Sequence, residues 1–249
     1  MFTGIEVLPP PLPAVGNTKF WYGAALTGPL ASPNSHLIVY TEYSNFFWRD
    51  GSDSWSKCSP RNGSLTKFVV FKGQVIGMVR SDRSLFMVHL TPQIRLQEIP
   101  VSWGGKNSMT KWHLCNPRLV VCGDMLLMVG CRKDFHVIGS VFEAYRLDTS
   151  TKLAKWVKVE RLEKWAIFIS NDSRAQPLPW MNPERWGGRS NCVYCYDSVS
   201  GHLVAFKLGK PLHGDDAPKS DVFSFSCYGS MVQPIWIVPS MFSLCCDGQ

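Results

Sequence analysis

Short apolar runs that alternate with polar turn residues cover most of the chain. Val, Ile, Phe, Tyr and Trp dominate the runs, and Gly, Pro, Asn, Asp and Ser cluster between them, as in β-strands joined by turns. Helical periodicity is nearly absent: only residues 161–168 are compatible with a helix, and their Trp and Ile suit a strand equally. The pattern predicts strands over residues 36–42, 45–50, 54–58, 67–73, 74–80, 85–90, 95–101, 118–124, 125–131, 141–148, 155–162, 191–197 and 202–208.

The predicted strands recur in similar groups, each with an apolar strand, a tight polar turn and further strands. If Trp48, Val88, Tyr145 and Phe206 are equivalent positions, they are separated by 40, 57 and 61 residues. These spacings bracket the period of about 40–50 residues expected for a four-stranded propeller blade. A β-sandwich, the competing all-β design, requires frequent turns but no long period. We therefore expect an all-β fold, a β-propeller-like array of four-stranded antiparallel sheets.

The array is expected to be incomplete, with about four to five blades, because only about four groups can be counted and propellers usually close with four to eight. Residues 1–35 are assigned to an N-terminal partial blade or linker, and residues 36–249 to the propeller domain. Within that domain, 172–190 and 209–221 are predicted loops, and 231–246 is predicted to be a buried strand with flanking turns.

Five motifs, in the same order along the chain, resemble one known family. They are FTGIEVLPPPLP (2–13), FFWRDGSDSWSKC (46–58), FEAYRLDTSTKLAKWVKVERLEKWAIFIS (142–170), SNCVYCYD (190–197) and PIWIVPSMF (234–242). The third is similar to a segment in which a strand ending in Leu-Asp precedes a Lys-Trp-Val strand. On these motifs the chain resembles the plant F-box-associated KIB-type β-propeller family (domain of unknown function 295) over almost its whole length.

The resemblance implies a plant protein whose full-length relatives carry an N-terminal F-box module. In those relatives the F-box docks on a cullin-type ubiquitin ligase through an adaptor, and the propeller presents a surface to the protein to be ubiquitinated. This sequence shows no amphipathic helical spacing before residue 37, so the F-box is expected to be missing. Direct binding of the ligase adaptor is therefore in doubt, whereas a partner-binding surface is expected.

Composition and charge indicate which kinds of partner and which cellular location to expect. The formal net charge is +7, which permits an acidic partner. The basic residues are scattered and match no recognised nucleic-acid-binding module, so nucleic acid is not an expected partner. Residues 1–13 do not form a secretory signal and no uninterrupted apolar stretch is long enough to span a bilayer, so no membrane association is expected. Nine cysteines in a chain of this length indicate reduced thiols, and hence a cytoplasmic or nuclear location.

Candidate chemistry is sparse, and we expect no catalytic, cofactor-binding or metal site. Cys192 and Cys195 form the one C-x-x-C pair, but in a strand with a period of two they point to opposite faces and cannot chelate one ion. The histidines lack metal-ligand spacing, and no nucleophile elbow or nucleotide-binding loop is present. We therefore predict that the protein is not an enzyme.

The best candidate for contact with a partner is the segment 172–190. It carries residues of the kinds enriched in binding hot spots, on a chain restrained by prolines. The candidate residues are Trp180, Met181, Arg185, Trp186 and Arg189. The alternative is that both tryptophans simply cover the rim of the propeller.

The sequence thus predicts a non-enzymatic protein-interaction module similar to the substrate-recognition propeller of plant F-box proteins. Two other interpretations stay open: a propeller-type enzyme or carbohydrate-binding protein, and a truncated gene product without function. No cofactor is expected, and the sequence does not identify the partner protein.

Overall fold

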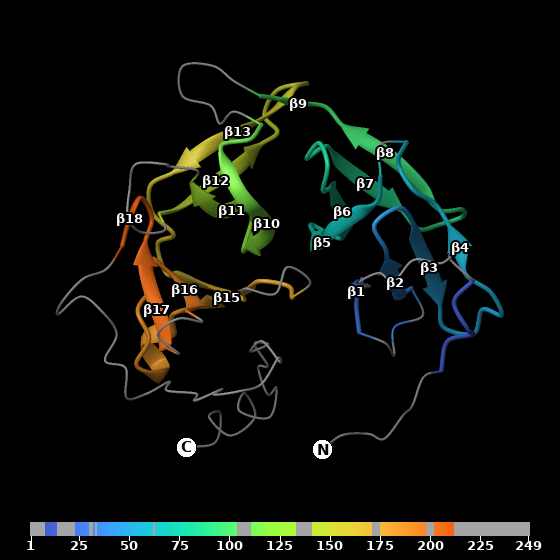
Figure 1. Ribbon diagram of the computed structural model, residues 1–249, viewed down its shortest axis with the longest axis horizontal. Helices are drawn as coiled ribbons and strands as arrows, with labels where there is room; N and C mark the ends of the chain where they lie inside the picture. Colours follow the sequence, from blue (N-terminus) through green and yellow to red (C-terminus); the bar gives the residue numbers. More distant parts are fainter. Residues whose placement is uncertain are drawn as a thin grey trace.

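The computed structural model describes residues 8–13, 23–29, 32, 34–61, 63–103, 111–132, 141–170, 175–197 and 202–211. In this part of the chain nearly all regular structure is β-strand, and the one helix is a short 3₁₀ turn. The strands form four sheets that are arranged as the blades of a β-propeller (Figure 1). The predicted all-β propeller is confirmed, and the described residues build four blades.

The first two blades are four-stranded antiparallel meanders in chain order. The first contains β1 (Gly23–Leu26), β2 (His36–Tyr40), β3 (Asn45–Arg49) and β4 (Ser56–Lys57). The second contains β5 (Leu65–Phe71), β6 (Gln74–Val79), β7 (Leu85–His89) and β8 (Arg95–Ile99).

The third and fourth blades each contain five strands. The third is the meander β10 (Leu114–Cys122), β11 (Met125–Arg132), β12 (Phe142–Asp148) and β13 (Ala154–Val159), with β9 (Val101–Ser102) parallel to β13. In the fourth the spatial order is β15 (Leu178–Met181), β14 (Trp165–Ile169), β16 (Cys192–Asp197), β17 (His202–Lys207) and β18 (Lys210–Pro211). The strands β14 and β16 are parallel, and the 3₁₀ turn η1 (Pro183–Trp186) lies between β15 and β16.

The repeat inferred from the sequence matches the position of the strands within the blades. Trp48, Val88, Tyr145 and Phe206 lie on β3, β7, β12 and β17, and each of these strands precedes the last antiparallel strand of its own blade. The strands β1, β5, β10 and β15 lie nearest the centre of the molecule (Figure 1). The unequal spacings therefore reflect loops of different length around equivalent strands.

Several short strands differ from the expectation. The stretch 172–190, assigned to a loop, contains β15 and η1, and the loop 209–221 begins with β18; its remainder and the predicted strand 231–246 lie outside the described residues. The ambiguous stretch 161–168 becomes β14 from Trp165 onward. The sequences of the inner strands β1 (Gly-Ala-Ala-Leu) and β15 (Leu-Pro-Trp-Met) give little strand signal because neither contains a β-branched residue and β15 contains a proline. At Gly23 the ring of Tyr40 lies where a Cβ would be, so the site requires glycine.

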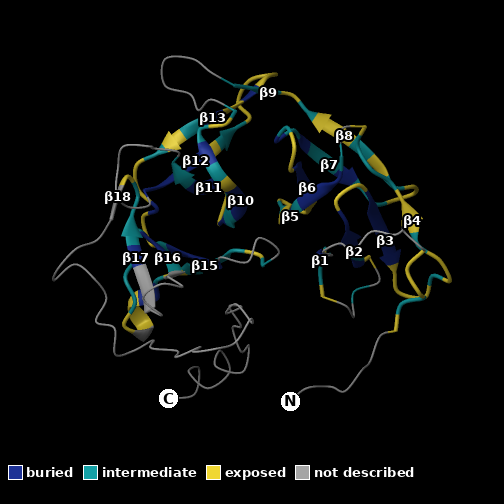
Figure 2. Ribbon diagram, in the orientation of Figure 1, coloured by how far each residue is buried: buried dark blue, intermediate teal, exposed yellow. Residues whose placement is uncertain are grey.

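Buried residues occur on strands of all four blades (Figure 2), and the hydrophobic core that they form is divided into clusters between neighbouring blades. In the third blade, successive residues of a strand alternate between the two clusters on either side: in β12, Ala144 faces the fourth blade and Tyr145 faces the second. The cluster between the second and third blades includes Met78, Leu85 and the fully buried Trp156. The inner strand β10 of the third blade therefore buries both faces, with Leu119 in one cluster and Val120 in the other, as expected for a sheet packed on both sides.

Each junction between blades also contains one buried polar side chain that binds the backbone of the next blade. The Asn45 side chain accepts a hydrogen bond from the Leu65 N–H at 2.8 Å and donates to the Leu65 carbonyl at 2.7 Å. Arg83 donates to carbonyls at the start of the third blade, and Arg118 donates to the Ser170 carbonyl of the fourth at 3.3 Å. We call these three side chains the interblade clamps.

Candidate partner-binding surface

The five residues chosen from the sequence lie along one edge of the fourth blade. Trp180 and Met181 end β15, Arg185 and Trp186 belong to η1, and Arg189 lies in the turn that leads to β16. The side chain of Trp186 lies outside the described part of the structure.

The exposure of these side chains differs. Trp180 is half-buried, pairs with Ala166 across the sheet, and packs on the apolar cluster that contains Phe168 and Tyr194. Met181 is 45% exposed, and Arg185 is exposed as well. Trp180 thus packs against its own blade, while Met181 and Arg185 face solvent.

The backbone that carries Arg185 is held by local hydrogen bonds. The Glu184 carboxylate accepts hydrogen bonds from the hydroxyl and the N–H of Ser190, and these bonds lower the pKa of Glu184. The Arg189 N–H donates to the Tyr194 hydroxyl at 2.7 Å. The turn therefore presents Arg185 from a constrained backbone, which reduces the entropy lost on docking.

A second exposed surface, absent from the sequence analysis, lies at one end of the first three blades. We call Tyr43, Arg80 and Trp112 the aromatic rim. Tyr43 is 62% and Trp112 52% exposed, and Arg80 is also exposed. Large exposed aromatic side chains next to arginine form the composition found at binding hot spots.

Hydrogen bonds between blades bring the three rim residues to the same end of the inner strands. The Ser64 hydroxyl, just before β5, donates to the Thr41 carbonyl in the turn that carries Tyr43. Arg83, in the turn that follows Arg80, donates to the carbonyls of Lys111 and Leu114 on either side of Trp112. The turns of three blades therefore meet around the starts of β5 and β10.

Arg83 also fixes the position of Trp112. Its guanidinium lies 4.8 Å from the centre of the indole ring, within range of a cation–π interaction. Arg83 is only 6% exposed, and burial lowers the pKa of its guanidinium. Trp112 therefore contacts a buried cation through its ring, while about half of its surface remains accessible.

The aromatic rim could not be found from the sequence. Tyr43 and Trp112 lie beside apolar strands, and other aromatic residues of such strands in the described part of the chain, such as Phe47, are buried. The polar residues 81–84 between two apolar runs indicate a turn, but nothing in the sequence indicates that Arg83 reaches the next blade. Exposure of these residues depends on how the turns of different blades meet.

A group of titratable side chains surrounds Glu143 on β12. Its carboxylate is 2% exposed and accepts hydrogen bonds from the His113 ring at 2.6 Å and the Tyr145 hydroxyl at 2.8 Å. Lys158 and Arg132 approach its second oxygen at 3.3 and 3.4 Å. Burial acts to raise the pKa of Glu143, but the hydrogen bonds and the nearby cations outweigh it and lower the pKa.

This cluster contains a His, a Glu and a Tyr, as some catalytic sites do, but its geometry favours a structural role. A carboxylate that stays ionised is a weak base and has no proton to donate near neutral pH. The same contacts raise the pKa of Tyr145, chiefly through burial and secondly through its hydrogen bond to Glu143. The cluster therefore joins β10 to β13 by charge and hydrogen bonding.

Replacing Glu143 by glutamine is expected to reduce the acid sensitivity of the fold. The folded pKa lies below the ordinary value of 4.5, so the contribution of Glu143 to stability is present above pH 4.5 and is lost as the pH falls through the folded value. At pH 7 the variant should unfold more easily, by about 2 kcal/mol, the size of a lost hydrogen bond to a charged group. Urea unfolding should show that the free energy of unfolding decreases less between pH 7 and lower pH in E143Q than in the wild type. Equal losses would contradict this role.

The cysteine geometry agrees with the expectation from the sequence. Cys192 packs with the cluster around Tyr194, whereas Cys195 packs on the opposite side of the sheet, against the cluster shared with the third blade. The described cysteines are free thiols, and burial raises the pKa of Cys122 to about 12. Among the described residues, no group of three or more His, Cys, Asp or Glu side chains is placed to hold a metal ion. The same part of the chain contains no helix long and apolar enough to cross a bilayer.

A family model described as the KIB1-4 beta-propeller matches residues 1–226, which include all four blades. A search of the curated proteins found no match.

Proposed function

Because the chain belongs to the KIB1-4 beta-propeller family, we propose that it is a non-enzymatic protein-interaction module that binds its partner through the aromatic rim. The observation that supports this proposal is the exposure of Tyr43 and Trp112 at one end of three joined blades. Rigid aromatic side chains supply large contact areas and lose little conformational entropy on binding.

The charge of the protein agrees with a protein partner that carries acidic groups near an apolar contact. The formal net charge is +7, and the guanidinium of Arg83 lies 4.8 Å from the ring centre of Trp112. Opposite charges at the edge of an interface speed association and orient the partner. We further propose that the bound protein is a ubiquitination substrate, as for the F-box-associated propellers that the sequence resembles, with the adaptor-docking helices outside this propeller.

The proposal is tested by quantitative affinity capture from plant extract with a double variant, Tyr43→Ala with Trp112→Ala. Partners bound through the rim should be recovered at least about tenfold less, since hot-spot truncations each cost about 2 kcal/mol or more. Leu153→Ala is the matched control, because Leu153 is 50% exposed but lies in the turn after β12. Recovery that is equal for the double variant and the control, with unchanged melting temperatures, contradicts a rim-mediated interaction.

A separate variant examines the surface that was predicted from the sequence. Met181→Ala combined with Arg185→Ala removes the two exposed side chains of the fourth-blade segment. If the rim is the main contact, this variant retains its partners. Loss of the partners in this variant alone would indicate that the binding surface lies on the fourth blade.

A further inference from the structure

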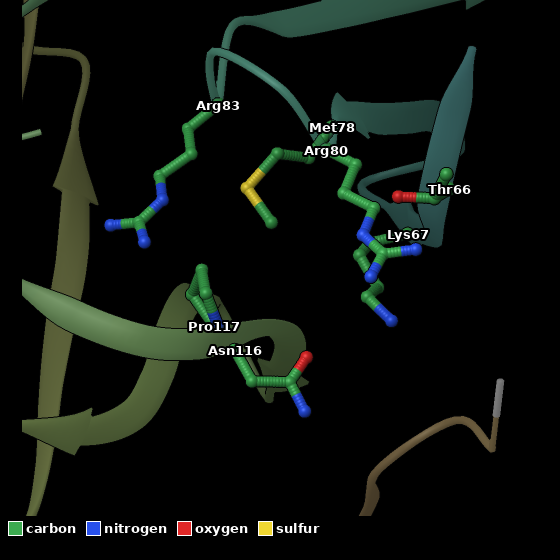
Figure 3. A pocket seen from close by; sticks show the side chains of 7 residues that line it. All are labelled: Thr66, Lys67, Met78, Arg80, Arg83, Asn116 and Pro117. Carbon is green, nitrogen blue, oxygen red and sulfur yellow. The ribbon is translucent and has the colours of Figure 1, made fainter. Parts of the chain in front are cut away.

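A cavity of about 300 Å³ lies between the second and third blades, beside the aromatic rim. Its volume is at the lower end of the range of about 300–1,000 Å³ found for small-molecule sites. The side chains that line it include Thr66, Lys67, Met78 and Arg80 from the second blade and Asn116 and Pro117 from the third (Figure 3).

Both inner strands that border the cavity are interrupted by β-bulges at the cavity itself. The register of β5 shifts between Leu65 and Lys67, so that Thr66 is the extra residue. The register of β10 shifts between Cys115 and Arg118, at Asn116 and Pro117, and Asn116 has a positive φ of 42°. Bulges redirect side chains and are over-represented next to functional sites. Here two bulges on adjacent blades turn polar side chains toward one space.

Thr66 contributes a buried hydroxyl to the lining of the cavity. Thr66 is 3% exposed, and its hydroxyl has no hydrogen-bond partner in the described part of the protein. Figure 3 shows this hydroxyl on the cavity side of β5. An unsatisfied buried hydroxyl costs free energy, and native proteins rarely leave one without a partner. A ligand oxygen in the cavity would accept its hydrogen bond.

The charges around the cavity indicate that its ligand is an anion. Lys67, Arg80 and Arg83 bring three cationic side chains to its lining, and no lining residue is acidic. Arg83 is engaged with the carbonyls of the third blade and with Trp112, so it contributes chiefly to the potential. The carboxylate of the adjacent turn, Asp82, accepts hydrogen bonds from the N–H and hydroxyl of Ser84.

We propose that this cavity binds a phosphate group. Arg80 and Lys67 neutralise its charge, the Thr66 hydroxyl donates a hydrogen bond to one oxygen, and the Asn116 amide supplies a further donor from the opposite blade. Arginine suits tetrahedral oxyanions because its planar guanidinium donates two parallel hydrogen bonds. The phosphate comes either from a small molecule or from a phosphorylated side chain of the partner. Binding of the free anion does not depend on the protein-interaction role.

The test is calorimetric titration of the full chain with inorganic phosphate at low ionic strength, about 25 mM sodium chloride, where screening is weak. Saturable binding is expected. Arg80→Gln should weaken it at least about tenfold, since a hydrogen bond to a charged group is worth about 1.5–3 kcal/mol. Thr66→Val, which removes only the hydroxyl, should also weaken binding measurably while leaving the melting temperature equal or higher, because the unsatisfied group is gone. Arg95→Gln, which removes an exposed positive charge from β8 of the same blade, should have no effect.

Further ligands distinguish the source of the phosphate. A short phosphoserine peptide that binds more tightly than inorganic phosphate, with the same dependence on Arg80 and Thr66, supports the site and assigns the phosphate to a protein side chain. Weaker binding of the peptide than of phosphate, with the same dependence, supports a small-molecule ligand. The proposal is overturned if neither ligand saturates, if acetate binds as tightly as phosphate, or if R95Q weakens binding as much as R80Q. Unchanged affinity in T66V also overturns it.

Discussion

Trp156→Ala is expected to lower the free energy of unfolding by about 3–5 kcal/mol, the range for large-to-small changes at a fully buried aromatic residue. Trp156 is 0% exposed although it lies on β13, near the outside of the third blade. It packs in the cluster between the second and third blades, with the ring of Trp103 at 6.5 Å. Its removal would leave a cavity at the junction of two blades, where neighbouring sheets cannot collapse to fill it. Chemical denaturation followed by circular dichroism measures the change.

Trp156→Phe separates packing from hydrogen bonding at the same position. The indole Nε1 of Trp156 is buried and has no hydrogen-bond partner in the described residues. Phenylalanine keeps most of the apolar volume and removes this unsatisfied donor, so its cost should be only about 1 kcal/mol. Leu153→Ala, at a half-exposed position, should change stability by about 0.5 kcal/mol or less. Equal costs for W156A and W156F would show that the packing argument is wrong.

Arg83→Met should destabilise the protein by about 3 kcal/mol, because one change removes two charge-assisted hydrogen bonds across a blade junction. The guanidinium donates to the Lys111 carbonyl and, at 2.5 Å, to the Leu114 carbonyl. Methionine retains most of the side-chain volume but leaves both acceptors without this donor. The variant should also lose the cation that supports Trp112, and so weaken partner binding by the rim.

Arg146→Met provides the control for the loss of positive charge. Arg146 is exposed on β12 of the third blade, so its replacement should change stability by no more than about 0.5 kcal/mol. A stability loss in R83M that is no larger than in R146M would mean that Arg83 does not join the blades. Urea unfolding of both variants and the wild type at neutral pH gives the free energies of unfolding that this comparison requires.

The interblade clamps offer a common explanation for how separate meanders remain in register. Asn45, Arg83 and Arg118 are each at most 6% exposed, and each binds backbone groups of the following blade. Apolar packing is non-directional, so it holds two sheets together without specifying how they are offset. Directional hydrogen bonds to backbone groups specify the offset, since a buried polar group that loses its partner is costly.

The candidate site could be predicted only in part. The sequence drew attention to Trp180, Met181, Arg185, Trp186 and Arg189 because of their residue types, and the structure places Met181 and Arg185 in solvent but packs Trp180 on its own blade. Residue type alone does not report exposure, because tryptophan is suited both to cores and to interfaces. The aromatic rim and the phosphate cavity could not be predicted from the sequence, because their residues come from separate blades.

Local patterning alone determined the all-β class, the position of the long strands and the equivalence of Trp48, Val88, Tyr145 and Phe206. These features follow from the side-chain period of two and from turn residues, both of which act over a few positions. Only the tertiary structure decided which turns meet, where bulges open the inner strands, and which buried polar groups bind across a junction. Those outcomes depend on contacts between residues far apart in the chain, and such contacts leave no periodic signal in a single sequence.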